Sequence, residues 1–496
     1  MRLTTFFLLC TPVVVMACGD GADGSDAGST TVDTASGSTG SNGGNGGNGG
    51  NGGNGGNGGN GGNGGTGGTT TEGPTYHQDV APLLIDRCGA CHVEGGIAPF
   101  SVHDAGTASA WAAPSLNAIE AGSMPPFFAE VTDECEPSVP FLDDPTLSEA
   151  EVQLLRDWVD AGAPEGDPTS AAPVEDKALD HLENPDLTLA LQQPFEVSGT
   201  QDIYQCFRIP LPIDGDRWIT GLEVLPDNDL VVHHVLVWRD PDDLSANKVG
   251  PDGSYRCSGE PDIWPTELVA AWTPGGSPMR TPEDSGAPIH PGESLVVNVH
   301  YHPTGTTTEL DQTEVALQLT DTQPSNYTTW YLVDIPFGAS VQTSSEGERD
   351  FRIPGGASDH DETVSLYIPD YIPLELPVFA ITPHMHYLGT DMLVTVDHPD
   401  DPDECLIHTP GYRFDFQTSY VYDAERDDLP VVSGGDRIDV RCTYDNSMSN
   451  PFIEDQLEAA GWSDPQDVTW GEDTGSEMCM AMVGLILPPI EITDLL

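Results

Sequence analysis

Basic residues are scarce in this sequence. Its 496 residues include 16 Lys and Arg against 81 Asp and Glu, which gives a formal net charge of −65. Because phosphate binding depends on clustered Lys and Arg, nucleic acid is excluded as an expected partner. The acidic balance is typical of a protein that stays soluble in a salty extracellular medium, and attraction of a basic redox partner is the second interpretation.

Long apolar runs are also scarce. The run at residues 3–16 follows Arg2 and is too short to span a membrane as a stable helix, so residues 1–17 are predicted to be a signal peptide. Residues 15–18, Val-Met-Ala-Cys, resemble a bacterial lipobox, which would make Cys18 the lipidated first residue of the mature chain. An ordinary cleaved signal with an incidental cysteine is the alternative. The lipobox interpretation predicts a cell-envelope protein, held at the outer membrane or cell surface by a lipid anchor alone.

Large apolar side chains are almost missing from residues 18–75. Residues 42–65 are an uninterrupted Asn-Gly-Gly repeat. A segment this rich in glycine cannot recover its ordering entropy by burial, so a flexible linker is predicted here.

A haem attachment pattern follows the linker. Cys88-Gly89-Ala90-Cys91-His92 has the Cys-x-x-Cys-His spacing of c-type cytochromes. In that interpretation Cys88 and Cys91 bind haem c covalently, His92 is the proximal iron ligand and Met124 is the distal ligand, with His103 as the rival. A redox dithiol and a chance match are the alternatives for the motif.

Helical signals surround this motif. Residues 77–84 read as a helix leading into it, and Ser148 with Glu151 forms a capping box that opens a closing helix. This order resembles a small class I cytochrome c domain, predicted for residues 76–168.

The rest of the chain predicts strands. Residues 186–496 contain short apolar segments separated by Gly, Pro and Asp. After a linker at 169–185 we therefore expect two antiparallel β-sandwich domains, at 186–325 and 326–496. The predicted fold class is multidomain, with a small α-helical domain followed by two β sandwiches.

Five histidines and one methionine stand on this strand-like sequence: His233, His234, His300, His384, His386 and Met478. Alternation around His300 predicts that Leu295, Val297, Val299 and Tyr301 share one face of a strand and that Asn298, His300 and His302 share the other. The adjacent pair His233-His234 can bind one ion only if the strand is bulged or twisted there. Imidazoles beside a soft thioether favour Cu(I), while zinc is the main alternative metal.

The order His-His, Val-His-Tyr, His-x-His and Glu-Met-Cys resembles the copper type II, ascorbate-dependent monooxygenases, the family of peptidylglycine α-hydroxylating monooxygenase and dopamine β-monooxygenase. The resemblance runs from about Cys206 to Pro488 and takes in Ala271-Trp272. It implies two jelly-roll-like domains that each hold one copper and face each other across a solvent-filled cleft.

The resemblance also implies roles for the ligands. His233, His234 and His300 would bind the electron-transfer copper. His384, His386 and Met478 would bind the copper where oxygen is activated, and they are the predicted catalytic residues. The extra His302 is interpreted as a neighbour of the first site.

Cysteine use favours an oxidising compartment. The resemblance implies two disulfides, Cys206–Cys257 and Cys442–Cys479. Cys135 and Cys405 have no partner in the family, so a bridge between them and two free thiols both remain open.

The sequence departs from the family where substrate is bound. Peptidylglycine enzymes hold a peptide carboxylate with an arginine, an asparagine and a tyrosine, and Thr382, Met480 and Met482 stand at these positions here. The expected substrate is therefore a neutral or apolar small molecule.

These features predict a copper monooxygenase that hydroxylates a C–H bond with O2. A haem fused to the chain would feed the electron-transfer copper and replace ascorbate partly or wholly, and a further redox protein is an expected partner. The alternatives are a non-catalytic electron-transfer or copper-binding envelope lipoprotein, and a zinc-dependent hydrolase, which leaves the haem motif unexplained.

Overall fold

The computed structural model describes residues 73–94, 98–174, 180–257, 259–274, 276–335, 339–341, 350–399, 401–471 and 475–489. The chain divides into two units between Thr69 and Thr70, and all described residues belong to the second unit. The predicted signal peptide, Cys18 and nearly all of the Asn/Gly-rich linker lie outside the described residues. In the described ranges, no helix has the length and apolar character needed to cross a membrane.

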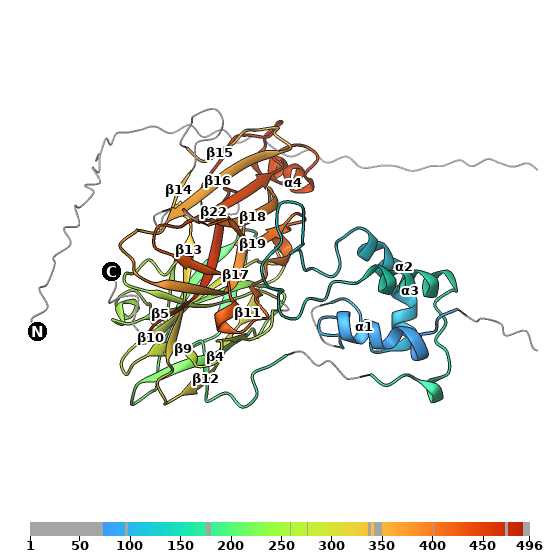
Figure 1. The fold of residues 1–496 in the computed structure, drawn as a ribbon, viewed down its shortest axis with the longest axis horizontal. Coiled ribbons are helices and arrows are strands. Elements are labelled where there is room, and N and C mark those ends of the chain that lie inside the picture. Colours follow the sequence, from blue (N-terminus) through green and yellow to red (C-terminus); the bar gives the residue numbers. More distant parts are fainter. Residues whose placement is uncertain are drawn as a thin grey trace, which may run out of the picture. The chain divides into compact units, whose positions relative to one another are not determined.

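The first described part of the chain is helical (Figure 1). Its elements are the π-helix η1 (Tyr76–Val80), α1 (Ala81–Cys88), α2 (Ala105–Glu120), α3 (Glu149–Asp160) and the 3-10 helix η2 (Pro168–Ser170). The predicted capping box is present, because Ser148 Oγ accepts from the backbone N–H of Glu151 and the Glu151 carboxylate accepts from the N–H of Ser148. Buried side chains of η1 and the three α-helices form one core, which includes Val80, Leu84, Leu116, Leu155 and Trp158.

Strands dominate the remainder. The first β region contains the 3-10 helix η3 (Leu244–Asn247) and the strands β1 (Leu187–Ala190), β2 (Phe195–Val197), β3 (Ile203–Pro210), β4 (Arg217–Leu225), β5 (Val232–Asp240), β6 (Ser254–Arg256), β7 (Glu267–Trp272), β8 (Met279–Arg280), β9 (Ser285–Ile289), β10 (Ser294–Tyr301), β11 (Glu309–Asp311) and β12 (Glu314–Thr320).

The second β region contains α4 (Pro451–Ala460), the 3-10 helices η5 (Phe414–Phe416) and η6 (Arg426–Asp428), and the strands β13 (Asn326–Val333), β14 (Ser340–Val341), β15 (Arg352–Ile353), β16 (His360–Tyr367), β17 (Glu375–His384), β18 (Gly389–Asp397), β19 (Glu404–Thr409), β20 (Tyr420–Val421), β21 (Val431–Ser433), β22 (Arg437–Tyr444), β23 (Val468–Thr469) and β24 (Met480–Leu487).

The first β region is a sheet folded over on itself. Strands β1, β12, β4 and β9 form one end of the order, and β7, β5, β10, β3 and β6 form the other. Apolar side chains from both ends, such as Leu317 on β12 and Val237 on β5, meet in one buried core. The predicted alternation on β10 is confirmed, since Leu295, Val297, Val299 and Tyr301 all lie in this core.

Strand β13 joins the two β regions. It pairs with β7 and β9 of the first region and, from Tyr327–Leu487 to Val333–Ala481, with β24 of the second. Strand β24 in turn pairs with β17, so one hydrogen-bonded network crosses the predicted boundary at residues 325/326. The structure is thus mostly β, with sandwich-like layers whose sheets are continuous rather than separate. Strand β13 is therefore paired with β24 along most of its length and with β9 and β7 at residues 326, 327 and 330.

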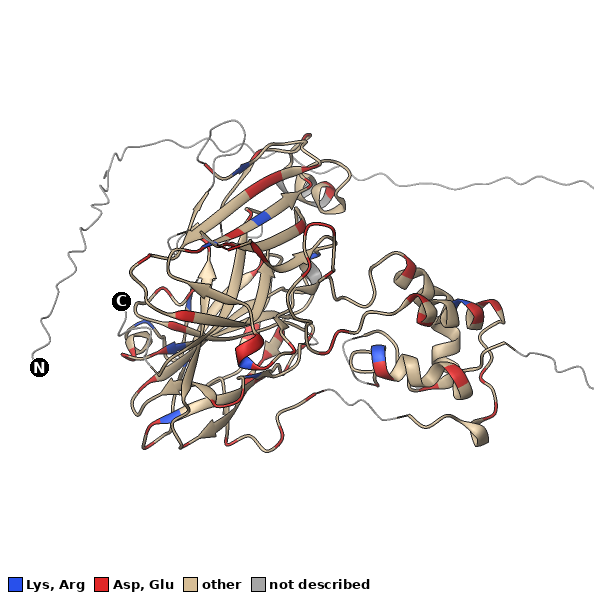
Figure 2. Ribbon diagram, in the orientation of Figure 1, with Lys and Arg blue, Asp and Glu red and all other residues tan. Residues whose placement is uncertain are grey.

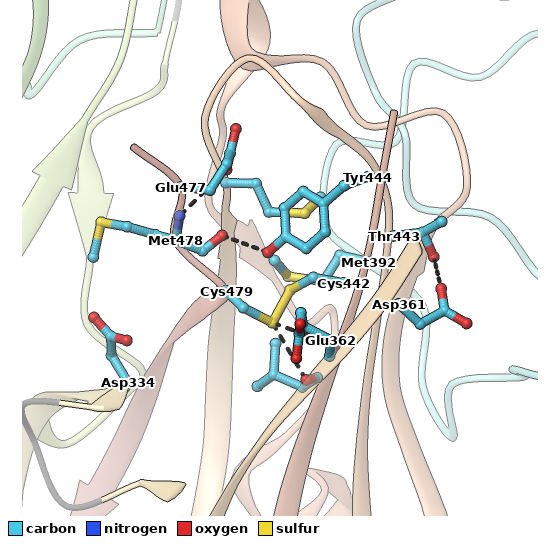
Figure 3. Close-up of a disulfide and its surroundings, with 12 residues drawn as sticks. Asp334, Asp361, Glu362, Met392, Cys442, Thr443, Tyr444, Glu477, Met478 and Cys479 are labelled. Atoms are coloured by element: carbon cyan, nitrogen blue, oxygen red, sulfur yellow. Dashed lines mark hydrogen bonds between the residues drawn. A yellow bond between two sulfur atoms is a disulfide. The ribbon is translucent and has the colours of Figure 1, made fainter. Parts of the chain in front are cut away.

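A second sheet, in the order β14-β16-β22-β18-β19, packs on the β17–β24 layer. Side chains such as Val394 and Val440 from this sheet share a buried core with Phe379 and Val483 from the other layer. The disulfide Cys442–Cys479 links β22 to the residue just before β24 (Figure 3).

The described residues contain three disulfides. Cys206–Cys257 and Cys442–Cys479 are the two pairs that the family resemblance implied. Cys135–Cys405 is the bridge that sequence reasoning left open. Three disulfides in one chain are typical of an extracytoplasmic, oxidising location.

Residues 127–144, here called the docking loop, leave the helical part between α2 and α3 and pack on the second β region. Phe127 and Phe141 contact its apolar core. The Phe141 ring stacks on Tyr422 at 5.0 Å, and Phe127 meets Tyr420 edge-on at 5.0 Å. The sequence did not predict this excursion from the helical domain.

Polar contacts and a covalent bond also hold the docking loop. The N–H of Glu130 donates to the carbonyl of His408 at 2.9 Å, and the N–H of Leu142 donates to the carbonyl of Val421 at 2.7 Å. Cys135 forms its disulfide with Cys405 at the start of β19. The loop therefore belongs structurally to the second β region, although the chain reaches it from the helices.

Acidic residues are spread along the described ribbon, with few basic ones between them (Figure 2). The most enclosed Lys or Arg side chain among the described ion pairs is Arg239, which is 2% exposed and bonded to Glu293 and Glu267. Most of the remaining acidic groups face solvent, in keeping with the interpretation of the charge as a solubility feature.

Replacing both Cys135 and Cys405 by Ser should lower the free energy of unfolding by up to about 5 kcal/mol, because the bridge closes a long loop in the unfolded chain. It should also make the docking loop sensitive to protease. Chemical unfolding and limited proteolysis measure both effects.

The matched control replaces Cys206 and Cys257, whose sequence separation is 51 rather than 270. That variant should lose a similar free energy, about 4 kcal/mol, without new cleavage in residues 127–144. Equal protease resistance of the parent and the Cys135/Cys405 variant would mean that the noncovalent contacts alone hold the loop.

Candidate metal centres

The first candidate site lies on the neighbouring strands β5 and β10. His300 pairs with His234, and the next pair, Tyr301 with Val232, leaves His233 as an extra residue on β5. This extra residue is a β-bulge. The sequence predicted that a bulge is needed here if both adjacent histidines are to face one site. The rings of His233 and His234 lie 5.0 Å and 4.7 Å from the ring of His300, measured between centroids.

The imidazole nitrogens of this site converge. Nδ1 of His234 lies 3.3 Å from Nδ1 of His233 and 3.3 Å from Nδ1 of His300. Two nitrogens bound to one tetrahedral ion at roughly 2.0–2.1 Å are about 3.3–3.4 Å apart. One ligand atom from each of the three residues lies within 4.8 Å of the others. The three side chains therefore fit a metal ion held by imidazoles.

Two side chains contact the His300 ring and hold it in place. Its Nε2 lies 3.1 Å from Oδ2 of Asp202, an ion-pair distance without the alignment of a hydrogen bond. The Tyr204 ring stacks on the imidazole with centroids 4.2 Å apart and planes 9° apart. A carboxylate behind a metal-binding imidazole fixes the ring and raises its basicity as a ligand.

The extra histidine, His302, contacts this support. Its Nδ1 lies 2.8 Å from Oδ1 of Asp202, and its side chain is 60% exposed. It is not part of the three-histidine group. Its position agrees with the interpretation of His302 as a neighbour of the first site.

The second candidate site forms at the end of β17. His384 is the last residue of that strand and pairs with Met480 of β24, whereas His386 lies beyond the strand end. The two ring centroids are 5.3 Å apart. The Tyr412 hydroxyl accepts from the N–H of Met385 at 2.9 Å and donates to its carbonyl at 2.7 Å, which fixes the backbone between the histidines.

Met478, the predicted thioether ligand, lines one cavity with His384 and His386. Figure 3 shows it between Glu477 and Cys479, with its carbonyl accepting from the Tyr444 hydroxyl at 2.7 Å. Glu477 is fully buried and accepts from the N–H groups of His386, Leu388 and Met478 at 2.9, 2.7 and 3.2 Å. One carboxylate thus ties the His-x-His turn to Met478, two residues before β24.

The two sites adjoin each other. The ring centroids of His234 and His384 are 6.4 Å apart, and the His233 ring stacks on Phe414 of the second β region at 5.1 Å. A cavity of about 1480 Å³ is lined by His234 as well as His384, His386 and Met478. The family resemblance implied two sites that face each other across a solvent-filled cleft.

Burial favours the neutral form of His233, His234 and His384. It lowers the pKa of His384 to about 3 and that of His233 to about 4, since the imidazolium form loses hydration, and neighbouring histidines lower both further. The pKa of His234 is lowered for the same reasons. A neutral imidazole has a lone pair to give to a metal. Burial acts on Glu477 in the opposite sense and raises its pKa to about 8, although three backbone donors oppose the shift.

The residues of the predicted haem site follow two helices, with Cys88, Cys91 and His92 at or just after the end of α1 and Met124 just after α2. Cys88, Cys91, His92 and Met124 line the same large cavity, and both thiols are free. Nδ1 of His92 lies 3.2 Å from the carbonyl oxygen of Phe100, which leaves Nε2 for a ligand. His103, the rival distal ligand, instead has Nε2 3.4 Å from the carbonyl oxygen of Gly89.

Comparison with known proteins bears on the first site. Residues 189–307, about a quarter of the chain, match the family model described as copper type II ascorbate-dependent monooxygenase, N-terminal domain. The matched segment contains His233, His234, His300 and the Cys206–Cys257 bridge. It ends before the second site and begins after the helices. No curated protein matches the chain.

Two solved structures show distant likenesses to this chain. The crystal structure of the major capsid protein P2 from bacteriophage PM2 is 10% identical, with a TM-score of 0.25, and the match covers 61% of this chain and 97% of that one. The structure of infectious bursal disease virus Gx strain is 7% identical, with a TM-score of 0.17, covering 61% and 72%. Likenesses this weak carry no weight for the function of this chain.

Sequence reasoning missed the supporting residues Asp202, Tyr204, Tyr412 and Gln417. Asp202 and Tyr204 lie far along the chain from His300, Tyr412 lies 27 residues from Met385 and Gln417 lies 33 residues from His384, and none of the four belongs to a recognisable motif. Glu477 was seen only as part of the Glu-Met-Cys segment, with no role assigned to it.

The metal-free protein should lose stability as the pH falls from about 6.5 to 4. An unfolded histidine takes up a proton near its ordinary pKa of about 6.5, whereas buried His384 does not until about 3, so protons favour the unfolded chain in this window. His384→Phe should flatten this part of the curve by about 1–3 kcal/mol relative to the parent.

Chemical unfolding at several pH values measures the difference. Glu477, whose raised pKa acts in the opposite direction between about 4.5 and 8, is present in both proteins and cancels. Parallel curves for parent and variant would contradict the burial of a neutral His384.

Proposed function

We propose that the chain is a copper-dependent monooxygenase that hydroxylates a C–H bond of a neutral or apolar small molecule. The observation that carries the proposal is the convergent group of His233, His234 and His300 inside the segment that matches the copper monooxygenase family. The reaction consumes O2, two electrons and two protons, and it gives one hydroxyl group on the substrate and one water.

Two copper ions would occupy the two candidate centres. His233, His234 and His300 would hold an electron-transfer copper, and His384, His386 and Met478 would hold a second copper with an open position for O2. Copper, when bound, supplies one-electron redox chemistry and the activation of O2. A ligand set of two imidazoles and a thioether supports this role because the soft sulfur favours Cu(I).

The protein itself fixes the positions of the ligands. Tyr412 holds the backbone of Met385 between the two histidines. Glu477 accepts from three backbone N–H groups and so keeps the His-x-His turn and Met478 in fixed relation. Because burial lowers the pKa of His233, His234 and His384, these three imidazoles have no proton to lose before a metal binds. The short distance between the rings of His234 and His384 supports electron transfer between the centres.

The cavity floor supports a neutral or apolar substrate. Leu332 on β13, Met482 on β24 and Thr382 on β17 lie side by side in register, and all three line the cavity. Met482 and Thr382 stand where peptidylglycine enzymes hold a carboxylate. The buried Asp334 also lines this cavity.

A covalently bound haem c is proposed as the electron donor. Cys88 and Cys91 would attach it, with His92 and Met124 as axial ligands. The geometry of His92 and the apolar lining near it, including Phe100, Trp111 and Ile119, support this interpretation. Burial raises the pKa of the Cys88 thiol to about 11, which argues against a redox dithiol because such chemistry needs an accessible thiolate.

Location and partners complete the proposal. Lipidation of Cys18 would hold the protein in the cell envelope, and electrons would reach the haem from another redox protein, with ascorbate as an external alternative. A non-catalytic copper-binding or electron-transfer protein is the second candidate, favoured by one fact: the family match covers only the first site.

Metal analysis and product labelling test the proposal. The mature protein should bind two coppers and one haem, and it should transfer one atom of ¹⁸O2 to product. His384→Ala should keep one copper and the haem spectrum while losing hydroxylation. Zinc in place of copper would overturn the proposal. One copper at saturation, with no labelled product from a screen of apolar substrates, would favour the non-catalytic candidate.

Electron flow gives a separate test. If the haem donates within the chain, reduced haem mixed with O2 should be reoxidised at a rate independent of protein concentration, because the docking loop and its disulfide keep donor and acceptor in one molecule. Stopped-flow spectroscopy of the haem band measures the rate. A rate proportional to concentration, or one unchanged in His233→Ala, would contradict the internal relay.

A further inference from the structure

Residues 412–420, here called the bridging segment, contact both candidate metal centres and the docking loop. The Phe414 ring stacks on His233 of the first site at 5.1 Å and meets His386 of the second edge-on at 6.0 Å. At the far end of the segment, the Tyr420 hydroxyl accepts from the N–H of Phe128 in the docking loop at 3.1 Å. The segment is thus the meeting point of three parts of the protein.

Gln417, within this segment, makes the most direct contact with a predicted ligand. Its carbonyl oxygen Oε1 lies 2.6 Å from Nδ1 of His384. A carbonyl oxygen only accepts, so Nδ1 must carry the proton, and the lone pair of His384 is then on Nε2. The contact therefore selects one tautomer and one ring orientation.

The amide of Gln417 is itself held in place. Its Nε2 donates to the carbonyl oxygen of Phe414 at 3.2 Å, which assigns the oxygen end of the amide to His384. Its backbone carbonyl accepts from the Thr273 hydroxyl of the first β region. Only 8% of the residue is exposed, so solvent competes little for these bonds.

We propose that Gln417 is a positioning residue of the second metal centre, which fixes His384 so that Nε2 faces the ion. Through Thr273 and Phe414 the same segment anchors this orientation to the first β region and to His233. This role rests on the proposed function, because it assumes a copper ion at His384, His386 and Met478. Partners of this kind that orient a ligand histidine typically affect metal affinity 10- to 100-fold, as an order of magnitude.

Three variants test the role. Gln417→Leu removes the acceptor at similar volume, and Gln417→Glu keeps an acceptor but adds negative charge. Gln312→Leu is the matched control, since Gln312 also donates one side-chain hydrogen bond, to the Leu191 carbonyl, but lies in the first β region away from both sites. Each is made in the full-length chain and loaded with Cu(I).

The readouts are copper affinity and the infrared stretch of carbon monoxide added as a probe of Cu(I) with an open position. Gln417→Leu should weaken one of the two coppers by roughly 10- to 100-fold and shift the carbon monoxide band. Gln417→Glu should keep both coppers and lower the band frequency, because a more basic imidazole makes the metal more electron-rich. Gln312→Leu should match the parent in both.

The outcomes separate the two levels of inference. A parent with two coppers whose affinity and carbon monoxide band are unchanged in Gln417→Leu overturns the role of Gln417 and leaves the proposed function standing. A parent that binds one copper overturns the second centre and the role together. If Gln417→Leu does not fold, Gln417→Asn withdraws the same amide by one methylene, and parent-like affinity and band in that variant overturn the role equally.

Discussion

Strand β13 is the constraint on which the arrangement of both sites depends. It pairs with β7 and β9 on one side and with β24 on the other, so the first and second β regions share backbone hydrogen bonds. Strands β5 and β10 carry three of the histidines. His384 is on β17, His386 follows β17 and Met478 precedes β24, and all four strands are parts of one sheet network. A hinge between two separate sandwiches would allow the sites to drift apart, whereas a paired strand resists such motion.

Local irregularity creates each site within this regular frame. On β5 the bulge at His233 turns two adjacent side chains toward one point, and on β17 the strand ends at His384 so that His386 can turn inward. Regular strands present alternate residues to opposite faces and would separate these side chains. The distortions are kept by neighbours from other elements, including Tyr204, Tyr412 and Glu477, which fix rings or backbone that the strand no longer fixes.

The docking loop gives the helical part a defined place on the second β region. Its aromatic residues enter the apolar core, its backbone pairs with β19 and β20 residues, and Cys135–Cys405 closes the attachment covalently. Because the loop is followed by α3, the helices are joined to the β regions here as well as through the chain that leads to β1. The bridging segment contacts the docking loop at one end and His384 further along.

Several structural features and the candidate ligands of this protein can be predicted from short-range sequence patterns. The capping box of α3, the alternation on β10 and the histidine, methionine and cysteine positions are short-range patterns, and each depends on residues close together in the chain. The need for a bulge at His233-His234 also follows from the period of a strand. The two expected disulfides came from resemblance to a family rather than from the residues alone.

Only the tertiary structure decided the rest. The continuity through β13, the excursion of residues 127–144 and the pairing of Cys135 with Cys405 join segments far apart in the sequence, where no local pattern records the contact. The same holds for Asp202 behind His300 and Gln417 behind His384. The types of ligand are set by side-chain chemistry, so they can be predicted from the sequence. Their orientation is set by packing and hydrogen bonds from distant elements, and these exist only once the chain has folded.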